Sequence, residues 1–219
     1  MPKTIRGGRQ LNIKPVPILI AAALIVIAVY GITHMGHRGM ATGLREPIQT
    51  EASGMKTFQK DGYTVSVDYL YEYDIIALVL HTKNYAPMTV MDRLAPKDLA
   101  LAWGDVAANN LNIDFHWNQM SRFYFWHVNS YSELAPVGSE ADVSLQSANC
   151  HIIAADLATR RQISRVRMGD IVHLKGYLVS VYASKPNGKY YFWESSTTRT
   201  DTGDGACEVI YVTSAEIMR

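Results

Sequence analysis

The sequence predicts an α+β fold dominated by β-strands, in which an N-terminal transmembrane helix precedes a single exported domain. We expect this domain to be a small coiled β-barrel or half-barrel with one or two helices. Three features of the 219-residue chain support this prediction. They are a long uncharged apolar stretch near the N-terminus, strand-like alternation after it, and bent strands separated by tight turns in the last third.

The apolar stretch covers residues 16–33 and contains no charged side chain. At about 1.5 Å of rise per residue it forms a helix of about 27 Å, close to the roughly 30 Å hydrocarbon core of a bilayer. The tail 1–15 carries four Lys or Arg and no acid, which favours a cytoplasmic N-terminus. The sequence therefore predicts a single-pass protein of the inner or plasma membrane, contacting the lipid bilayer through 16–33.

A cleaved signal peptide is the main alternative to a retained anchor. Its apolar core is about 7 to 15 residues long and ends at small residues of the A-x-A type. The stretch here is longer, and residues 34–38 contain no such pattern. A buried helix of a soluble domain is a third interpretation of the same residues.

After the anchor, the glycine-containing segment 34–55 is predicted to be a tether and residues 56–219 to be the exported globular domain. This domain is long enough to bury a core. Residues 46–219 carry fifteen bases and twenty acids, a formal charge of −5. Such a balance argues against a nucleic-acid partner.

Two strands and one helix are predicted in the first part of the domain. Residues 63–73 alternate between apolar and polar, as in a half-buried strand, and residues 74–81 are continuously apolar, as in a strand buried on both faces. A helix is predicted from Pro96 to about Asn109, because proline suits its first turn. Its apolar residues recur at helical spacing: Leu99, Ala102, Trp103, Val106 and Ala107.

Residues 113–117 and 122–128 are rich in aromatic residues and are predicted to form a hairpin. Aromatic side chains at period two can form a stacking platform for single-stranded nucleic acid or sugars. We favour the interpretation that they pack a core.

The last third contains a strand over 171–182 whose apolar face changes sides near Gly176. A glycine at that point suits a bulge or a bend. Residues 185–188 form a turn, and strands are predicted over 189–195 and 206–213. Bent strands with short connections indicate a coiled barrel.

Cys150 and Cys207 both lie in the predicted exported domain. Paired cysteines are usual in an oxidising compartment, and we predict a disulfide between them. Closing a loop of this span stabilises a fold by about 4 kcal/mol on the chain-entropy argument. Two separate buried thiols are the alternative.

The loop 195–208, SSTTRTDTGDGACE, is the most polar segment and holds the candidate site residues. Asp201, Asp204 and Glu208 could supply oxygen ligands to calcium, although their spacing fits the known loop pattern only in part. The triplet that begins at Asp201 also matches that of aspartic proteases, which require two such triplets, whereas this chain has one.

A catalytic interpretation of the same loop uses Cys207 as nucleophile, His151 as base and Asp201 as the acid that orients it. None of the usual local signatures surrounds Cys207. The histidines show no zinc spacing, and no cofactor is expected.

These observations predict a non-enzymatic envelope protein that binds or scaffolds other proteins of a membrane-associated complex. The alternative is an envelope hydrolase that uses the loop from Ser195 to Glu208 together with His151.

Overall fold

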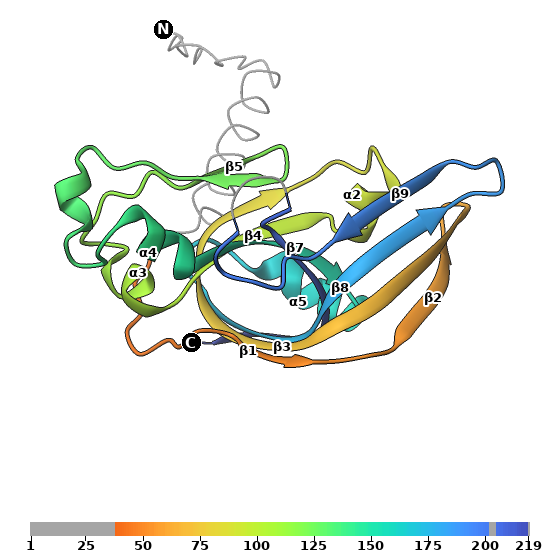
Figure 1. The fold of residues 1–219 in the computed structure, drawn as a ribbon, viewed down its shortest axis with the longest axis horizontal. Helices are drawn as coiled ribbons and strands as arrows, with labels where there is room; N and C mark the ends of the chain where they lie inside the picture. The colour runs from red at the N-terminus through yellow and green to blue at the C-terminus, as the bar shows by residue number, and fades with distance from the viewer. Residues whose placement is uncertain (1–37, 202–204, 219) are drawn as a thin grey trace, which may run out of the picture. The chain divides into compact units, whose positions relative to one another are not determined.

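The computed structural model describes residues 38–201 and 205–218. They form the expected β-dominant α+β fold, built on one large sheet (Figure 1). The predicted tail 1–15 and anchor 16–33 lie outside the described residues, and none of the helices within these residues is long and apolar enough to cross a membrane. The strands are β1 (Ile48–Glu51), β2 (Met55–Lys60), β3 (Tyr63–Asn84), β4 (Lys97–Ala102), β5 (Asn118–Met120), β6 (Phe123–Phe125), β7 (Ser147–Ala154), β8 (Ile171–Ser184), β9 (Tyr190–Glu194) and β10 (Glu208–Met218). The helices are α2 (Val90–Leu94), α3 (Gly104–Asn109), the 3₁₀ turn η1 (Tyr131–Leu134), α4 (Glu140–Leu145) and α5 (Leu157–Arg165).

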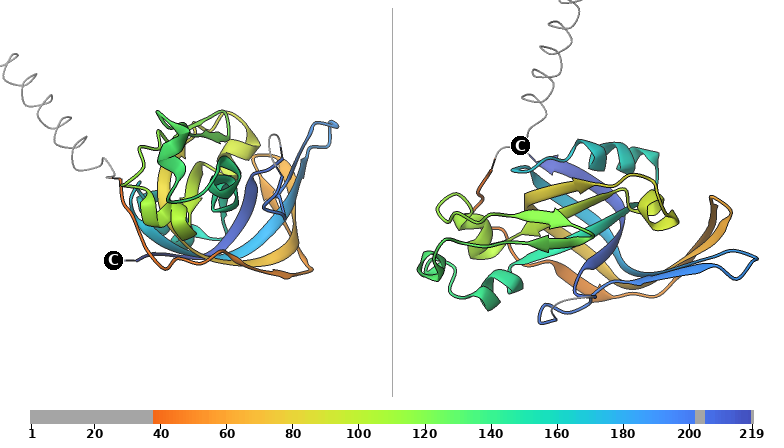
Figure 2. Two further views of the ribbon diagram at one scale, coloured as in Figure 1. Left: turned by 60° about the vertical axis from the view of Figure 1, so that its left-hand side comes forward. Right: turned by 90° about the horizontal axis from the view of Figure 1, so that it is seen from above.

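Five strands of the large sheet close into a ring, which is the coiled barrel expected from the sequence (Figure 2). β3 pairs with β4, β4 with β7, β7 with β10, β10 with β8, and β8 again with β3. Only the β7–β10 pair is parallel. Helix α5 joins β7 to β8, packs against β7 and β10, and buries Ile163 in the core. The ring is thus a five-stranded β-barrel with α5 packed against two of its strands.

The sheet buries its two faces against different clusters, and β8 passes from one to the other. Val172, Leu174 and Leu178 belong to the cluster inside the ring, which we call the inner cluster. Val179 and Val181 belong to a second cluster on the opposite face, beside β2 and β9. The predicted change of the apolar face along this strand is therefore confirmed.

Gly176 of β8 lies opposite Val212 of β10, close to the β10 backbone. A Cβ atom at this position would lie 2.0 Å from the carbonyl oxygen of Tyr211, so no other residue fits without moving the backbone. The bulges that accompany the change of face are in the partner strands, between Val212 and Ser214 of β10 and between Tyr69 and Tyr71 of β3. The lack of a side chain at Gly176 thus permits the close approach of β8 to β10, and the bulges lie in the neighbouring strands β10 and β3.

The predicted helix over 96–109 is half wrong. Its first part is strand β4, and only α3 is helical. All six residues of β4 are buried, because β3 and β7 pair with its two edges and both of its faces are covered: Leu99 faces the inner cluster and Ala100 a cluster on the outer face. A strand buried on both faces has no polar side, so its apolar residues also fit a helical period.

The segment predicted as a tether contains structure. Residues 48–51 form β1, which pairs with β3, and further upstream the Ala41 amide donates to the carbonyl of Ala107. These residues, which the prediction placed before the domain, belong to the folded unit.

The connection from β4 to β7, residues 103–146, covers the outer face of the ring. It contains α3, the β5–β6 hairpin, η1 and α4. Ile113 and Phe115 are buried with Leu78 and Ala102 in a third cluster, which confirms the core interpretation for this part of the aromatic segment. A hairpin is present, but its first strand is β5 and not the predicted strand over 113–117, which is irregular; only the second strand, β6, falls within a predicted segment.

Candidate functional site

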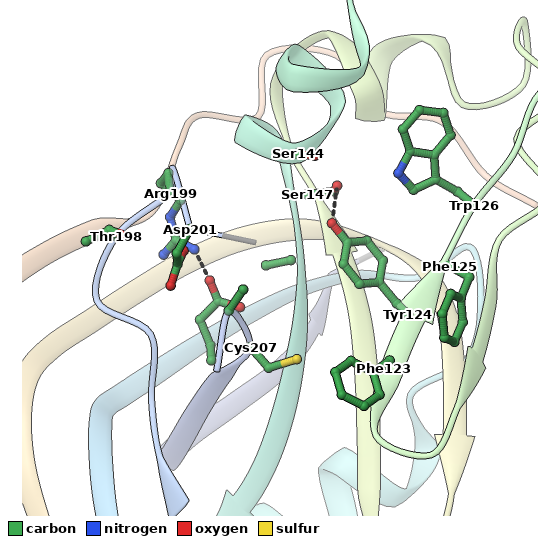
Figure 3. Close-up of a pocket in the computed structure, with 13 residues that line it drawn as sticks. Phe123, Tyr124, Phe125, Trp126, Ser144, Ser147, Thr198, Arg199, Asp201 and Cys207 are labelled. Atoms are coloured by element: carbon green, nitrogen blue, oxygen red, sulfur yellow. Dashed lines mark hydrogen bonds and ion pairs between the residues drawn. The ribbon is translucent and has the colours of Figure 1, made fainter. Parts of the chain in front are cut away.

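A cavity of about 370 Å³ opens between the β5–β6 hairpin and the loop 195–208. Strand β6 and helix α4 with the start of β7 form one side, and the loop forms the other. Figure 3 shows the aromatic side chains on one wall and Arg199, Asp201 and Cys207 on the opposite wall. We call this cavity the aromatic pocket.

The aromatic wall is positioned by a two-residue turn. Ser121 and Arg122 have φ values of 52° and 73°, as the tight hairpin turn between β5 and β6 requires. After this turn, Phe123 and Phe125 remain 36 % and 49 % exposed, and both line the pocket. The two rings therefore present apolar surface both to the cavity and to solvent.

Tyr124, between these phenylalanines, points into the protein. Its hydroxyl lies 3.1 Å from the Ser147 hydroxyl, which itself donates to the carbonyl of Val143. Tyr124 therefore donates to Ser147. Burial raises the pKa of Tyr124, so this side chain is neutral at physiological pH.

The opposite wall is held to the sheet by several hydrogen bonds. The Ser196 amide donates to the carbonyl of Cys207, and the Val209 amide donates to the Ser195 hydroxyl. From β1, the Gln49 side chain donates to the carbonyl of Thr197. The described parts of this glycine-rich loop are thus fixed at both ends.

Arg199 forms the ionic centre of this wall. Its guanidinium pairs with Glu208, which is only 1 % exposed, and also donates to the Tyr73 hydroxyl at 3.1 Å. Burial raises the pKa of Tyr73. Arg199 also lines a larger open cavity of about 1090 Å³, on the side of residues 43–48. The ion pair therefore separates two cavities.

The predicted disulfide is wrong: Cys150 and Cys207 are thiols in this structure. In the parallel β7–β10 register Cys150 lies opposite Glu208, so Cys207 is one position away, opposite Asn149. Successive residues of a strand point to opposite faces. Cys150 therefore lies in the inner cluster, whereas the Cys207 sulfur is 3.4 Å from the Asn149 amide nitrogen on the other face. Burial raises the pKa of Cys150.

The structure separates the predicted catalytic residues. Cys207 and Asp201 both line the aromatic pocket, but His151 does not. Its Nδ1 lies 3.0 Å from a carboxylate oxygen of Asp98, and its ring lies 4.3 Å from that of Trp193. The acid beside His151 is thus Asp98, not Asp201.

The calcium hypothesis is only partly covered by the structure. Asp204 lies outside the described residues, and Glu208 is engaged by Arg199. In the part of the chain that is described, no three His, Cys, Asp or Glu side chains are grouped so that they could hold a metal ion.

A second ionic cluster, which the sequence analysis missed, lies on the outer face of the ring beneath the β5–β6 hairpin. Arg122 donates to Asp98 at 2.7 Å and to Asp92 at 2.6 Å, and its guanidinium carbon lies 3.6 Å from the centre of the Tyr85 ring. Asp98 is fully buried. We call these residues, with His151, the Arg122 cluster.

Polar side chains extend this cluster along the hairpin. His81 contacts Gln119 at 3.0 Å, Gln119 donates to Asn149 at 2.6 Å, and Asn149 donates to the carbonyl of Arg122. The adjacent charges Lys97 and Asp98 at the start of the otherwise apolar segment KDLALA were the only sequence signal for this arrangement.

Comparison with protein families, curated proteins and solved structures finds no match for this chain.

Proposed function

We propose that this chain is a single-pass envelope protein whose barrel domain binds a protein partner at the aromatic pocket, as a non-enzymatic component of a membrane-associated complex. The observation that carries the proposal is the pocket itself, with Phe123 and Phe125 exposed at its edge. Exposed aromatic side chains beside a cavity are the typical anchors of protein interfaces.

The charged groups near the pocket support binding more than catalysis. Arg199 and Glu208 form an ion pair, and His151 contacts Asp98 beneath the hairpin, outside the pocket. A base within hydrogen-bond reach is one common way to activate a nucleophile. The histidine proposed for that role belongs to a different cluster.

Photo-crosslinking in the native membrane tests this proposal. A photoreactive phenylalanine analogue replaces Phe125 in the full chain, and the matched control carries it at Phe192, which is 59 % exposed on β9. We expect a discrete crosslinked protein from position 125 and not from position 192. Equal crosslinking at both positions, or none at 125, contradicts a partner at the pocket.

The proposed membrane topology has its own test. A reporter that is active only outside the cytoplasm is fused after Arg219 of the full chain. We expect activity, because the basic residues precede the apolar stretch. Activity from a cytoplasmic reporter alone contradicts the proposed location.

An envelope hydrolase remains the second candidate, because Cys207 and Asp201 line the same pocket. A catalytic thiolate reacts with iodoacetamide well below the usual thiol pKa of about 8.5. Rapid alkylation of Cys207 at pH 6, lost on acid unfolding, supports the hydrolase; ordinary thiol reactivity contradicts it.

A further inference from the structure

The charges that line the aromatic pocket favour a cationic ligand. The described lining residues include one base, Arg199, and two acids, Asp201 and Glu208. Arg199 is paired with Glu208, which leaves the carboxylate of Asp201 without an ion-pair partner among the described residues. An anionic ligand would find no unpaired cation there, whereas a cationic one would find a carboxylate.

The aromatic wall adds a second attraction for a cation. Phe123 and Phe125 lie 6.5 Å apart between ring centres, and both remain exposed. A cation above an aromatic face is attracted by the negative electrostatic potential of the ring face. Aromatic rings also cover the apolar stem of a long basic side chain.

The molecule already binds one of its own arginines in this way. Arg122 lies over the Tyr85 ring while it donates to the carboxylates of Asp98 and Asp92. The pocket offers the same two kinds of partner, an aromatic face and a carboxylate, with a cavity between them in place of a guanidinium.

We infer that the aromatic pocket receives an arginine side chain from the protein partner, with its guanidinium between the phenylalanines of β6 and Asp201. This inference rests on the proposed function and names the chemistry of the partner. Arginine is preferred to lysine because its planar guanidinium both stacks on rings and pairs with a carboxylate in two hydrogen bonds.

A ligand-observed NMR titration of the full chain in lipid nanodiscs tests this inference. The probes are the blocked peptides acetyl-Gly-Arg-Gly-amide, its lysine analogue and its citrulline analogue, which has the shape of arginine without the charge. We expect the arginine peptide to bind at least about fivefold more tightly than the citrulline peptide, and more tightly than the lysine peptide.

Two variants locate the binding. Asp201→Asn should remove the preference for arginine over citrulline, and Phe125→Ala should weaken arginine binding by about three- to fivefold. The matched controls are Glu51→Gln, an exposed acid on β1, and Phe192→Ala on β9, and both should bind as the parent does. Equal affinity for arginine and citrulline, or binding unchanged in both pocket variants, overturns the inference.

The crosslinking experiment separates the two proposals. A partner captured at position 125 without arginine selectivity overturns the ligand chemistry and leaves the binding function supported. An arginine peptide that binds in the pocket while no protein is captured supports the ligand chemistry and contradicts the protein partner.

Discussion

The two arginine clusters differ in what surrounds them, although each pairs a guanidinium with a buried carboxylate. The Arg122 cluster lies beneath the β5–β6 hairpin and lines neither of the cavities described above. The Arg199–Glu208 pair lies between two cavities. The two arginine side chains are similarly exposed, 20 % for Arg122 and 22 % for Arg199, so the difference lies in their surroundings. The Arg122 cluster holds an insertion on the barrel, whereas Arg199 and Glu208 form part of a cavity wall. The comparison therefore distinguishes a polar cluster beneath the hairpin from one at a cavity wall.

The largest effect is expected from Arg122→Ala. It leaves the fully buried Asp98 carboxylate without its cation, so we expect a loss of about 3–5 kcal/mol in the free energy of unfolding. Urea denaturation measures it. Arg93→Ala is the matched control, because Arg93 pairs with Asp61 at the surface and should cost less than about 1 kcal/mol. Equal losses in the two variants would show that the buried Asp98 carboxylate does not depend on Arg122.

Arg199→Ala should cost less, about 1–3 kcal/mol, because water from the adjoining cavities can then reach the carboxylate of Glu208. The same denaturation experiment compares it with Arg122→Ala. A loss as large as that of Arg122→Ala would break the distinction between the two clusters. Arg199→Lys, which keeps the charge but not the planar fork, should recover part of the loss.

Each thiol lies beside a different cluster. Cys150 contacts Glu208 of the Arg199 pair, and Cys207 contacts Asn149, which extends the Arg122 cluster. Because they lie on opposite faces, the losses from Cys150→Ser and Cys207→Ser should add, and reductant should leave the melting temperature unchanged. Native alkylation should reach Cys207 before the fully buried Cys150. Non-additive losses together with a melting temperature that falls in reductant would restore the disulfide.

The smallest expected effect is the contribution of Asp92 to the pH dependence of the free energy of unfolding. Burial raises the pKa of this carboxyl, but hydrogen bonds from Arg122 and Thr89 outweigh it and hold the pKa below its ordinary value. The stabilisation is therefore present above about pH 4 and is lost as the pH falls through the folded-state pKa. Asp92→Asn should remove this contribution, less than about 1 kcal/mol because the group is partly exposed. A difference between parent and variant that does not shrink from pH 5 to pH 2 contradicts this assignment.

The parts of the fold that the sequence predicted are those encoded in local patterns. The change of the apolar face near Gly176 is visible in the alternation of β8 itself, and the barrel follows from it. Strand β4 was mistaken for a helix because both of its faces are buried, one by the inner cluster and the other by the third cluster, whose members come from distant parts of the chain. Its six residues carry no alternation that could have revealed them.

The candidate site was harder to predict, because it depends on register and on long-range contacts. Cys150 and Cys207 lie on neighbouring strands, yet a difference of one position places them on opposite faces. Arg122 and Asp98 are 24 residues apart and belong to different elements, and nothing in either segment specifies the other. Composition drew attention to the loop 195–208, whereas the phenylalanines that face it were assigned to a core.

The place of β10 between β7 and β8 has a consequence for how the domain folds. The ring cannot close until β10, the last strand in the described chain, inserts between two strands that precede it. Until then β7 and β8 each present an unpaired edge, a template for association with other chains. Pairings of such high sequence separation form slowly, on the millisecond-to-second scale typical of β-barrels. A chain that emerges gradually from a ribosome or a translocon would therefore hold these two edges open until β10 emerges, and this interval is when a chaperone would have the most to protect.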